Sequence, residues 1–202
     1  MLASLTSEDN EDYARRLEGI LKCAKSFFGE GYFQENTGHF WGLVETRPFM
    51  RSKMELIGAL INLKRYKEAI RHCEEMLLLN PNDNQGIRDI LLGLYLETDL
   101  LEQTRNLLKN FQDDDSAVFS WGRVLERFLS GDEPGALKAL KHAHTENPFV
   151  RDYLIGKKRP PLNSPEYYSP GSKEEAYEIL LDLAMAWSNH PDALSWLKSV
   201  SR

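Results

Sequence analysis

Residues 38–51, GHFWGLVETRPFMR, bring together more chemically capable side chains than any other part of the chain. His39 could exchange a proton, Glu45 could orient its ring, and Arg47 and Arg51 could bind an anion. The two arginines are spaced i, i+4, so they share a face if the helix already includes Arg47. This pattern supports one hypothesis, an enzyme or small-ligand sensor built on this segment.

The same segment also has a structural interpretation, which we favour. Phe40, Trp41 and Phe49 are large apolar side chains that can anchor a loop against the first helices. Pro48 suits the first turn of a helix, and Thr46 can cap that helix. In this interpretation the segment holds no catalytic residue, and we expect the chain not to be an enzyme.

Other catalytic and ligand-binding motifs are absent from the sequence. It holds no GxxxxGK[ST] or GxGxxG phosphate-binding loop, no GxSxG turn and no HExxH pair. The five histidines and the two cysteines, Cys23 and Cys73, lack the spacing of a metal site. We therefore expect no metal and no cofactor, and we expect both cysteines to be buried in helices.

The composition is that of an ordinary globular chain. Of its 202 residues 42% are hydrophobic and 28% charged, which suffices for a real core in one domain. The net charge of −6 argues against nucleic-acid binding, which relies on clustered Lys and Arg. MLASLTSEDNED does not resemble a signal peptide, and no apolar window reaches about 18 residues. We expect a cytoplasmic chain without a membrane segment.

Helical periodicity runs through the chain, and no stretch alternates like a strand. The apolar spacing predicts a helix over residues 13–28, ended by Gly29 and Gly31, and then a non-helical stretch over 30–45. Pro48 opens the next helix, whose apolar face we expect at Met54, Ile57, Leu60 and Ile61. Further helices are predicted at 66–79, through Ile87 to Tyr95, through Leu107, at 116–129 and at 133–146.

Local signals predict several helix ends. The Asn80-Pro81 pair ends one helix, because the residue before a proline leaves the helical region. Asn82 is the predicted N-cap of the next helix, with Gln85 completing a capping box. Ser172 with Glu175 forms a second capping box, and Pro191 opens the last helix.

The chain contains an internal repeat. EAIRHCEEMLLLNP at 68–81 matches GALKALKHAHTENP at 135–148, with an alanine twelve residues before a proline in both. The copies, Ala69 to Pro81 and Ala136 to Pro148, lie 67 residues apart, close to two periods of about 34 residues. A weaker middle copy has Thr104 in the place of the alanine.

This spacing resembles the tetratricopeptide repeat. The resemblance covers residues 47–148 and implies an all-α fold, a solenoid of about three helical hairpins in which Ala69, Pro81, Ala136 and Pro148 are framework positions. It implies four parts: an N-terminal helix and aromatic loop capping the array (1–46), the helix pairs (47–156), a Pro-rich connection (157–171) and a C-terminal helical cap (172–202).

The C-terminal part carries a second resemblance. NPFVRDYLIGKKRPP followed by SKEEAYEILLDLAMAWSNHPDALSWLKS is similar to the C-terminal region of the suppression-of-tumorigenicity family. The 38–51 segment is also similar to a recurring feature of uncharacterised bacterial tetratricopeptide-repeat proteins. These resemblances imply a shared repeat module, and neither implies a known activity.

In tetratricopeptide arrays the first helix of each pair lines a groove. Here these helices offer polar pairs spaced i, i+4: Arg47 and Arg51, Asn84 and Arg88, and Arg123 and Arg127. Arginine forks suit carboxylates, and asparagine can hold a peptide backbone. We therefore predict a non-catalytic interaction module that binds a protein or peptide with an acidic group. A structural oligomer is the remaining alternative, and monomer and dimer both stay open.

Overall fold

The computed structural model describes residues 7–161 and 165–200, and every regular element in these ranges is helical. The predicted all-α class is therefore confirmed. The first six residues of the predicted N-terminal part and residues 162–164 of the Pro-rich connection lie outside the described ranges. The chain divides into two compact units, Met1–Leu91 and Leu92–Arg202, with the boundary inside one helix. The four-part division predicted from the sequence stays a prediction.

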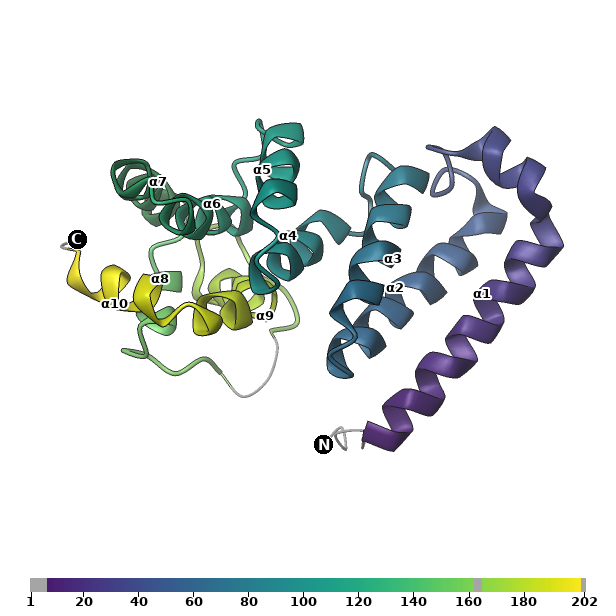
Figure 1. Ribbon diagram of the computed structural model, residues 1–202, viewed down its shortest axis with the longest axis horizontal. Helices are drawn as coiled ribbons and strands as arrows, with labels where there is room; N and C mark the ends of the chain where they lie inside the picture. The colour runs from purple at the N-terminus through teal and green to yellow at the C-terminus, as the bar shows by residue number, and fades with distance from the viewer. Residues whose placement is uncertain (1–6, 162–164, 201–202) are drawn as a thin grey trace. The chain divides into compact units, whose positions relative to one another are not determined.

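The N-terminal unit is built on three long helices that lie side by side (Figure 1). They are α1 (Ser7–Asn36), α2 (Arg47–Asn62) and α3 (Tyr66–Leu79), with the short 3-10 helix η1 (Val44–Thr46) before α2. The helix α4 (Ile87–Glu97) begins in this unit and crosses its boundary. α2 packs against both α1 and α3.

The helix α1 is longer than predicted, and residues 30–36 belong to it. Gly29 interrupts it with φ 77° and ψ 159°, values that only glycine adopts readily, and the helix then resumes. The predicted stop at Gly29 is therefore a break and not an end. Residues beyond the break carry Tyr32 and Phe33, whose burial against the following loop explains why the helix resumes.

The apolar face of α2 differs from the predicted one. The buried residues of this helix are Phe49, Met50, Lys53, Leu56, Ile57, Ala59 and Leu60, whereas Met54 and Ile61 are only half-buried. A lysine thus occupies a position on the buried face. Pro48 stands in the first turn as predicted, and Lys64 adopts φ 57° in the tight turn that leads to α3.

The turn between α3 and α4 corrects a second prediction. α3 ends at the Asn80-Pro81 pair as expected, but Asn82 does not cap α4. Asp83 does so: its two carboxylate oxygens accept hydrogen bonds from the backbone N–H groups of Ile87 (2.8 Å) and Arg88 (3.0 Å). Asp83 itself is buried, with φ 49°.

The C-terminal unit contains the rest of α4 and six further helices (Figure 1). They are α5 (Leu101–Asn110), α6 (Ala117–Leu129), α7 (Glu133–Glu146), α8 (Val150–Leu154), α9 (Lys173–Asn189) and α10 (Pro191–Ser199). α6 is central, since it packs against α5, α7, α9 and α10. The large fully buried side chains of this unit include Trp121, Phe119 and Trp187.

Both predicted signals at the C-terminal helices are confirmed. The Ser172 hydroxyl accepts a hydrogen bond from the Glu175 backbone N–H (3.0 Å), and Glu175 reaches back to the Gly171 N–H (2.7 Å). Pro191 lies in the first turn of α10. Among the described helices, none combines the length and apolar character needed to span a bilayer.

Candidate functional site

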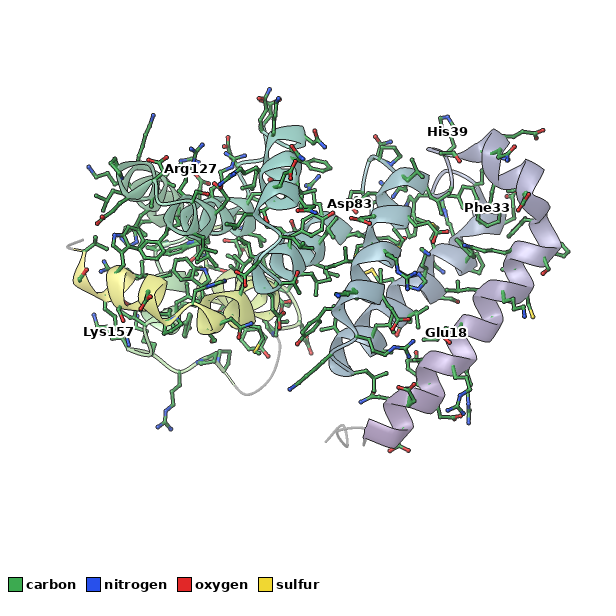
Figure 2. The ribbon with its side chains drawn as sticks, in the orientation of Figure 1. Glu18, Phe33, His39, Asp83, Arg127 and Lys157 are labelled. Atoms are coloured by element: carbon green, nitrogen blue, oxygen red, sulfur yellow. The ribbon has the colours of Figure 1, made fainter. Side chains whose placement is uncertain are left out.

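The 38–51 segment is held by a cluster of aromatic rings. Phe40 is fully buried and Phe49 nearly so, and both rings contact Phe33 of α1, at centroid distances of 4.8 and 5.3 Å. The Phe40 N–H donates to the Leu79 carbonyl, 3.1 Å away, which joins the loop to the end of α3. Figure 2 shows Phe33 between α1 and the loop-α2 region. These contacts are those of loop anchors.

Two side chains of the segment are used for its own structure. Thr46 does not cap α2, contrary to the prediction, because its hydroxyl donates to the backbone carbonyls of Phe40 and Leu43. Arg47 donates from Nε to the Trp41 carbonyl (3.0 Å), and its guanidinium lies 5.7 Å from the centre of the half-buried Trp41 ring.

The structure does not bring His39 and Glu45 together as the enzyme hypothesis requires. His39 is exposed and points outward (Figure 2), and its imidazole hydrogen-bonds to no residue that the structure describes. Glu45 instead accepts a hydrogen bond from the Tyr32 hydroxyl, 3.2 Å away. The orientation of a catalytic imidazole by Glu45 is therefore not present in this geometry.

The remaining predicted arginines differ in their exposure and in the contacts that their guanidinium groups already make. Arg51 is exposed on α2 and contacts no described residue through hydrogen bonds or ion pairs. Arg88 is half-buried, with its Nε 3.9 Å from Asp83. In the C-terminal unit Arg123 donates to the backbone carbonyls of Phe111 (3.3 Å) and Gln112 (3.1 Å). Of these three, only Arg51 has its full set of donors available to a partner.

The turn before α4 contributes polar groups beside Arg51. Asn84 is exposed, while Gln85 is half-buried and donates from Nε2 to the Met54 sulfur at 3.8 Å. Met54 lies one helical turn after Arg51 on α2, so this contact brings the turn to α2 one helical turn away from the arginine. The Gln85 side-chain oxygen is buried and accepts no hydrogen bond from any residue that the structure describes. Arg51, Asn84 and Gln85 together are called the turn surface below.

Ala69 and Ala136 are fully buried, as the repeat interpretation requires of small residues at close helix crossings. Pro81 and Pro148 each follow a buried asparagine that ends a helix, Asn80 after α3 and Asn147 after α7. The equivalent position of the middle copy, Thr104, is buried too.

A network of charged and polar side chains that the sequence did not reveal joins the three long helices of the N-terminal unit. Lys53 has no exposed surface, and its Nζ contacts Glu75 Oε2 (2.5 Å) and His72 Nδ1 (2.8 Å). Glu75 also accepts from Lys25 Nζ of α1, 2.8 Å away. The four residues, called the Lys53 network below, join α1, α2 and α3. Burying a charged side chain costs free energy, and proteins tolerate this only when the charge is paired.

Burial and charge shift the ionisation of this network in defined directions. Burial lowers the pKa of Lys53, against the attraction of Glu75. Burial, and then the nearby Lys53 charge, lower the pKa of His72 to about 4, so the ring is neutral at pH 7. Burial raises the pKa of Glu75, but hydrogen bonds from Lys25 and Lys53 outweigh it and bring that pKa below its ordinary value.

The Cys73 thiol, next to His72 in the sequence, is expected to be unreactive. Burial raises the pKa of the Cys73 thiol to about 12, so almost no thiolate is present at pH 7. Cys73 is buried as predicted, whereas Cys23 is exposed on α1, contrary to the prediction. The described residues include no group of three or more His, Cys, Asp or Glu side chains that could hold a metal ion.

A cavity of about 580 Å³ adjoins the Lys53 network, and the sequence signal for it is weak. It lies between the part of α1 before Gly29 and the facing sides of α2 and α3, and is called the α1 pocket below. The only sequence trace was a lysine at Lys53, three residues after Met50 and four before Ile57, in the apolar stripe of α2. Nothing in the sequence alone joins that position to His72 or Glu75.

Comparison of this chain with models of protein families, with curated proteins and with solved structures found no match.

Proposed function

We propose that this chain is a non-catalytic peptide-interaction module with a tetratricopeptide-like arrangement of helical hairpins. The turn surface of the N-terminal unit is its binding site, and its partner is a peptide that carries an acidic group. The single observation behind this proposal is the buried Gln85 side-chain oxygen, which accepts no hydrogen bond from a described residue and lies against Met54, one helical turn from the exposed Arg51.

The chemistry of the turn surface suits a peptide. A buried acceptor without a hydrogen bond carries the cost of its lost hydration, so a donor that reaches it gains more than it would at an exposed group. The final torsion of a glutamine side chain is soft, and Met54 beside it is a flexible neighbour. A peptide N–H can therefore reach the Gln85 oxygen after a small rotation of the amide.

Arg51 supplies the complement for the acidic group. A free guanidinium can bind a carboxylate through two parallel N–H···O bonds, which are stronger than bonds between neutral groups. Asn84 adds an amide that can hydrogen-bond to a peptide backbone. Three binding residues are enough for such a site, because a few residues carry most of the binding energy in many interfaces.

The test is selection of peptides from a random library displayed on phage, followed by affinity measurement with the whole chain. We expect the selected peptides to share an Asp, a Glu or a free carboxyl terminus. Arg51→Ala should weaken their binding by about tenfold or more, because a charge-assisted bond is lost. Arg71→Ala is the matched control, since Arg71 is an exposed arginine of α3 that forms an ion pair, at 3.8 Å, with Glu68 one helical turn before it.

Selected peptides that bind Arg51→Ala as tightly as the wild type would contradict the turn-surface assignment. Failure to select any peptide would contradict the interaction-module proposal itself. Arg88 is not used in this test, because it also contacts Asp83 at the start of α4.

A further inference from the structure

The α1 pocket is a second concave site, separate from the turn surface. Arg51 and Lys53 are two residues apart on α2, one exposed and one fully buried, so they belong to different faces of the helix. The pocket is lined by Lys22, Lys25 and Leu21 of α1, Lys53 and Leu56 of α2, and His72 of α3. Its volume of about 580 Å³ is within the usual range for sites that bind small molecules.

His72 presents a fixed hydrogen-bond donor to this pocket. Lys53 Nζ can only donate, so His72 Nδ1 must be the acceptor of their 2.8 Å contact. The proton of the neutral ring is therefore on Nε2, where no described residue accepts it. The Lys53 contact holds one tautomer in place, as a hydrogen bond to the other ring nitrogen does in functional histidines.

Two lysines add donors on the α1 side. The Lys25 ammonium uses one contact for Glu75 (2.8 Å) and is about half exposed, so two of its N–H groups remain for a ligand. Lys22 is exposed on the same wall and forms no hydrogen bond or ion pair with a described residue. The N–H donors of His72, Lys25 and Lys22 together can bind an oxyanion.

The charge balance limits how much negative charge the ligand can carry. The lining holds three lysines and two glutamates, Glu18 and Glu30, which gives 3 − 2 = +1. Two further charges are bound to these side chains, Glu75 on Lys25 and Lys53 and Arg65 on Glu18, and together they leave the local sum at +1. A site of this balance favours a single negative charge over a phosphate dianion, because added like charges repel the acidic residues.

The walls also include apolar surface. Leu21 and Leu56 border the pocket but are only 5% and 0% exposed, so the apolar surface within reach of a ligand is that of the methylene stems of Lys22 and Lys25. A ligand with a short hydrocarbon body can cover these stems and remove them from water.

We propose that the α1 pocket binds a small aliphatic monocarboxylate, with the carboxylate at His72 Nε2, Lys25 and Lys22 and the hydrocarbon body against the methylene stems of the two exposed lysines. The ligand bridges α1 and α3, so its binding would stabilise the packing of α1 on the rest of the N-terminal unit.

The test follows the imidazole nitrogen signals of the whole chain by NMR, with butyrate as the probe and its neutral isostere butyramide as the comparison. His72→Gln identifies the His72 signal. We expect butyrate to shift this signal saturably, and we expect butyramide to bind at least about tenfold more weakly, since it lacks the charge that the lysines attract.

Lys25→Gln should weaken butyrate binding by about tenfold, because it removes a charged donor from an exposed position without opening the core. Lys67→Gln, an exposed lysine of α3 that does not line the pocket, is the matched control and should bind butyrate like the wild type. Circular dichroism of each variant establishes that it is folded.

The proposal would be overturned by no saturable shift with butyrate, by equal binding of butyramide, or by equal loss in Lys25→Gln and Lys67→Gln. None of them bears on the peptide selection at Arg51, so the two proposals fail separately. Inorganic phosphate binding more tightly than butyrate would likewise overturn the choice of a monocarboxylate.

Discussion

At the scale of single residues, the N-terminal unit depends on one charge that water cannot reach, the Lys53 ammonium. Lys53 is fully buried and is stabilised by Glu75 and His72, two partners that come from the facing helix. Removing one member of such a set costs more than removing an exposed ion pair, because the remaining charge stays buried without compensation. By contrast, the exposed ion pairs of Arg15 and Arg16 with Asp12 contribute little.

The pH dependence of stability follows from His72. Its pKa is about 6.5 in an unfolded chain and about 4 in the folded unit, so the unfolded chain takes up the proton first as the pH falls. The stability that the neutral ring contributes is complete above pH 6.5 and is lost progressively towards pH 4. We expect the wild type to lose about 2–3 kcal/mol more than His72→Gln across this window, measured by amide hydrogen exchange of α3.

His39→Gln is the control for this measurement, because His39 is exposed and contacts no described side chain through a hydrogen bond. It should follow the wild-type pH profile. A His72→Gln profile as steep as that of the wild type would show that the ring is not held neutral in the folded unit.

At the scale of elements, α1 shows how one backbone position shapes a helix. Gly29 has φ 77° and ψ 159°, while its neighbour Gly31 lies within the regular helix that follows. The break redirects the chain so that Tyr32 and Phe33 meet the rings of Phe40 and Phe49. The helix α1 thus lines the α1 pocket and also carries the rings that hold the 38–51 loop.

Alanine substitutions at these two glycines should have opposite effects. Gly29→Ala forces a side chain into a conformation that L-residues rarely adopt and should cost about 1–3 kcal/mol. Gly31→Ala meets no atom within 4 Å and should stabilise by about 0.5–1 kcal/mol, because alanine loses less entropy in a helix. Urea unfolding followed by circular dichroism measures both. A stabilising effect at both positions would contradict the observed break.

At the scale of the whole molecule, two compact units each have a core of their own. In the C-terminal unit the backbones of α4 and α9 approach so closely that a Cβ at Gly93 would lie 2.1 Å from the Asp182 carbonyl oxygen. A Cβ at Gly122 of α6 would meet the Leu92 side chain at 2.6 Å, which a change of the leucine rotamer can relieve. At Gly93 the obstacle is backbone, so a larger side chain could enter only if a helix moved.

Gly93→Ala should therefore destabilise the C-terminal unit by about 3 kcal/mol or more, since the obstructing atom belongs to the backbone and cannot rotate away. Gly58→Ala is the matched helical control: it lies on the exposed side of α2 with nothing within 4 Å, and should stabilise by about 0.5–1 kcal/mol. Thermal unfolding measures both. A neutral effect of Gly93→Ala would contradict the close approach of α4 and α9.

The sequence by itself determined the class of the fold and most helix ends. Pro48, the Asn80-Pro81 pair, Ser172 with Glu175, and Pro191 act through their own backbone geometry and hydrogen bonds, so neighbours within a few residues suffice to predict them. Phe40 and Phe49 were likewise predicted as anchors, because large apolar side chains are seldom left exposed in a loop.

Only the tertiary structure decided the rest. The hydrogen bonds of the Asp83 carboxylate to the first N–H groups of α4, the exposure of Cys23 and the break at Gly29 each depend on how the chain packs around the residue. The Lys53 network depends on it most, because Lys25, Lys53 and Glu75 come from three helices and no local pattern links them. A buried charge is tolerated only through partners that packing supplies, so periodicity cannot reveal it.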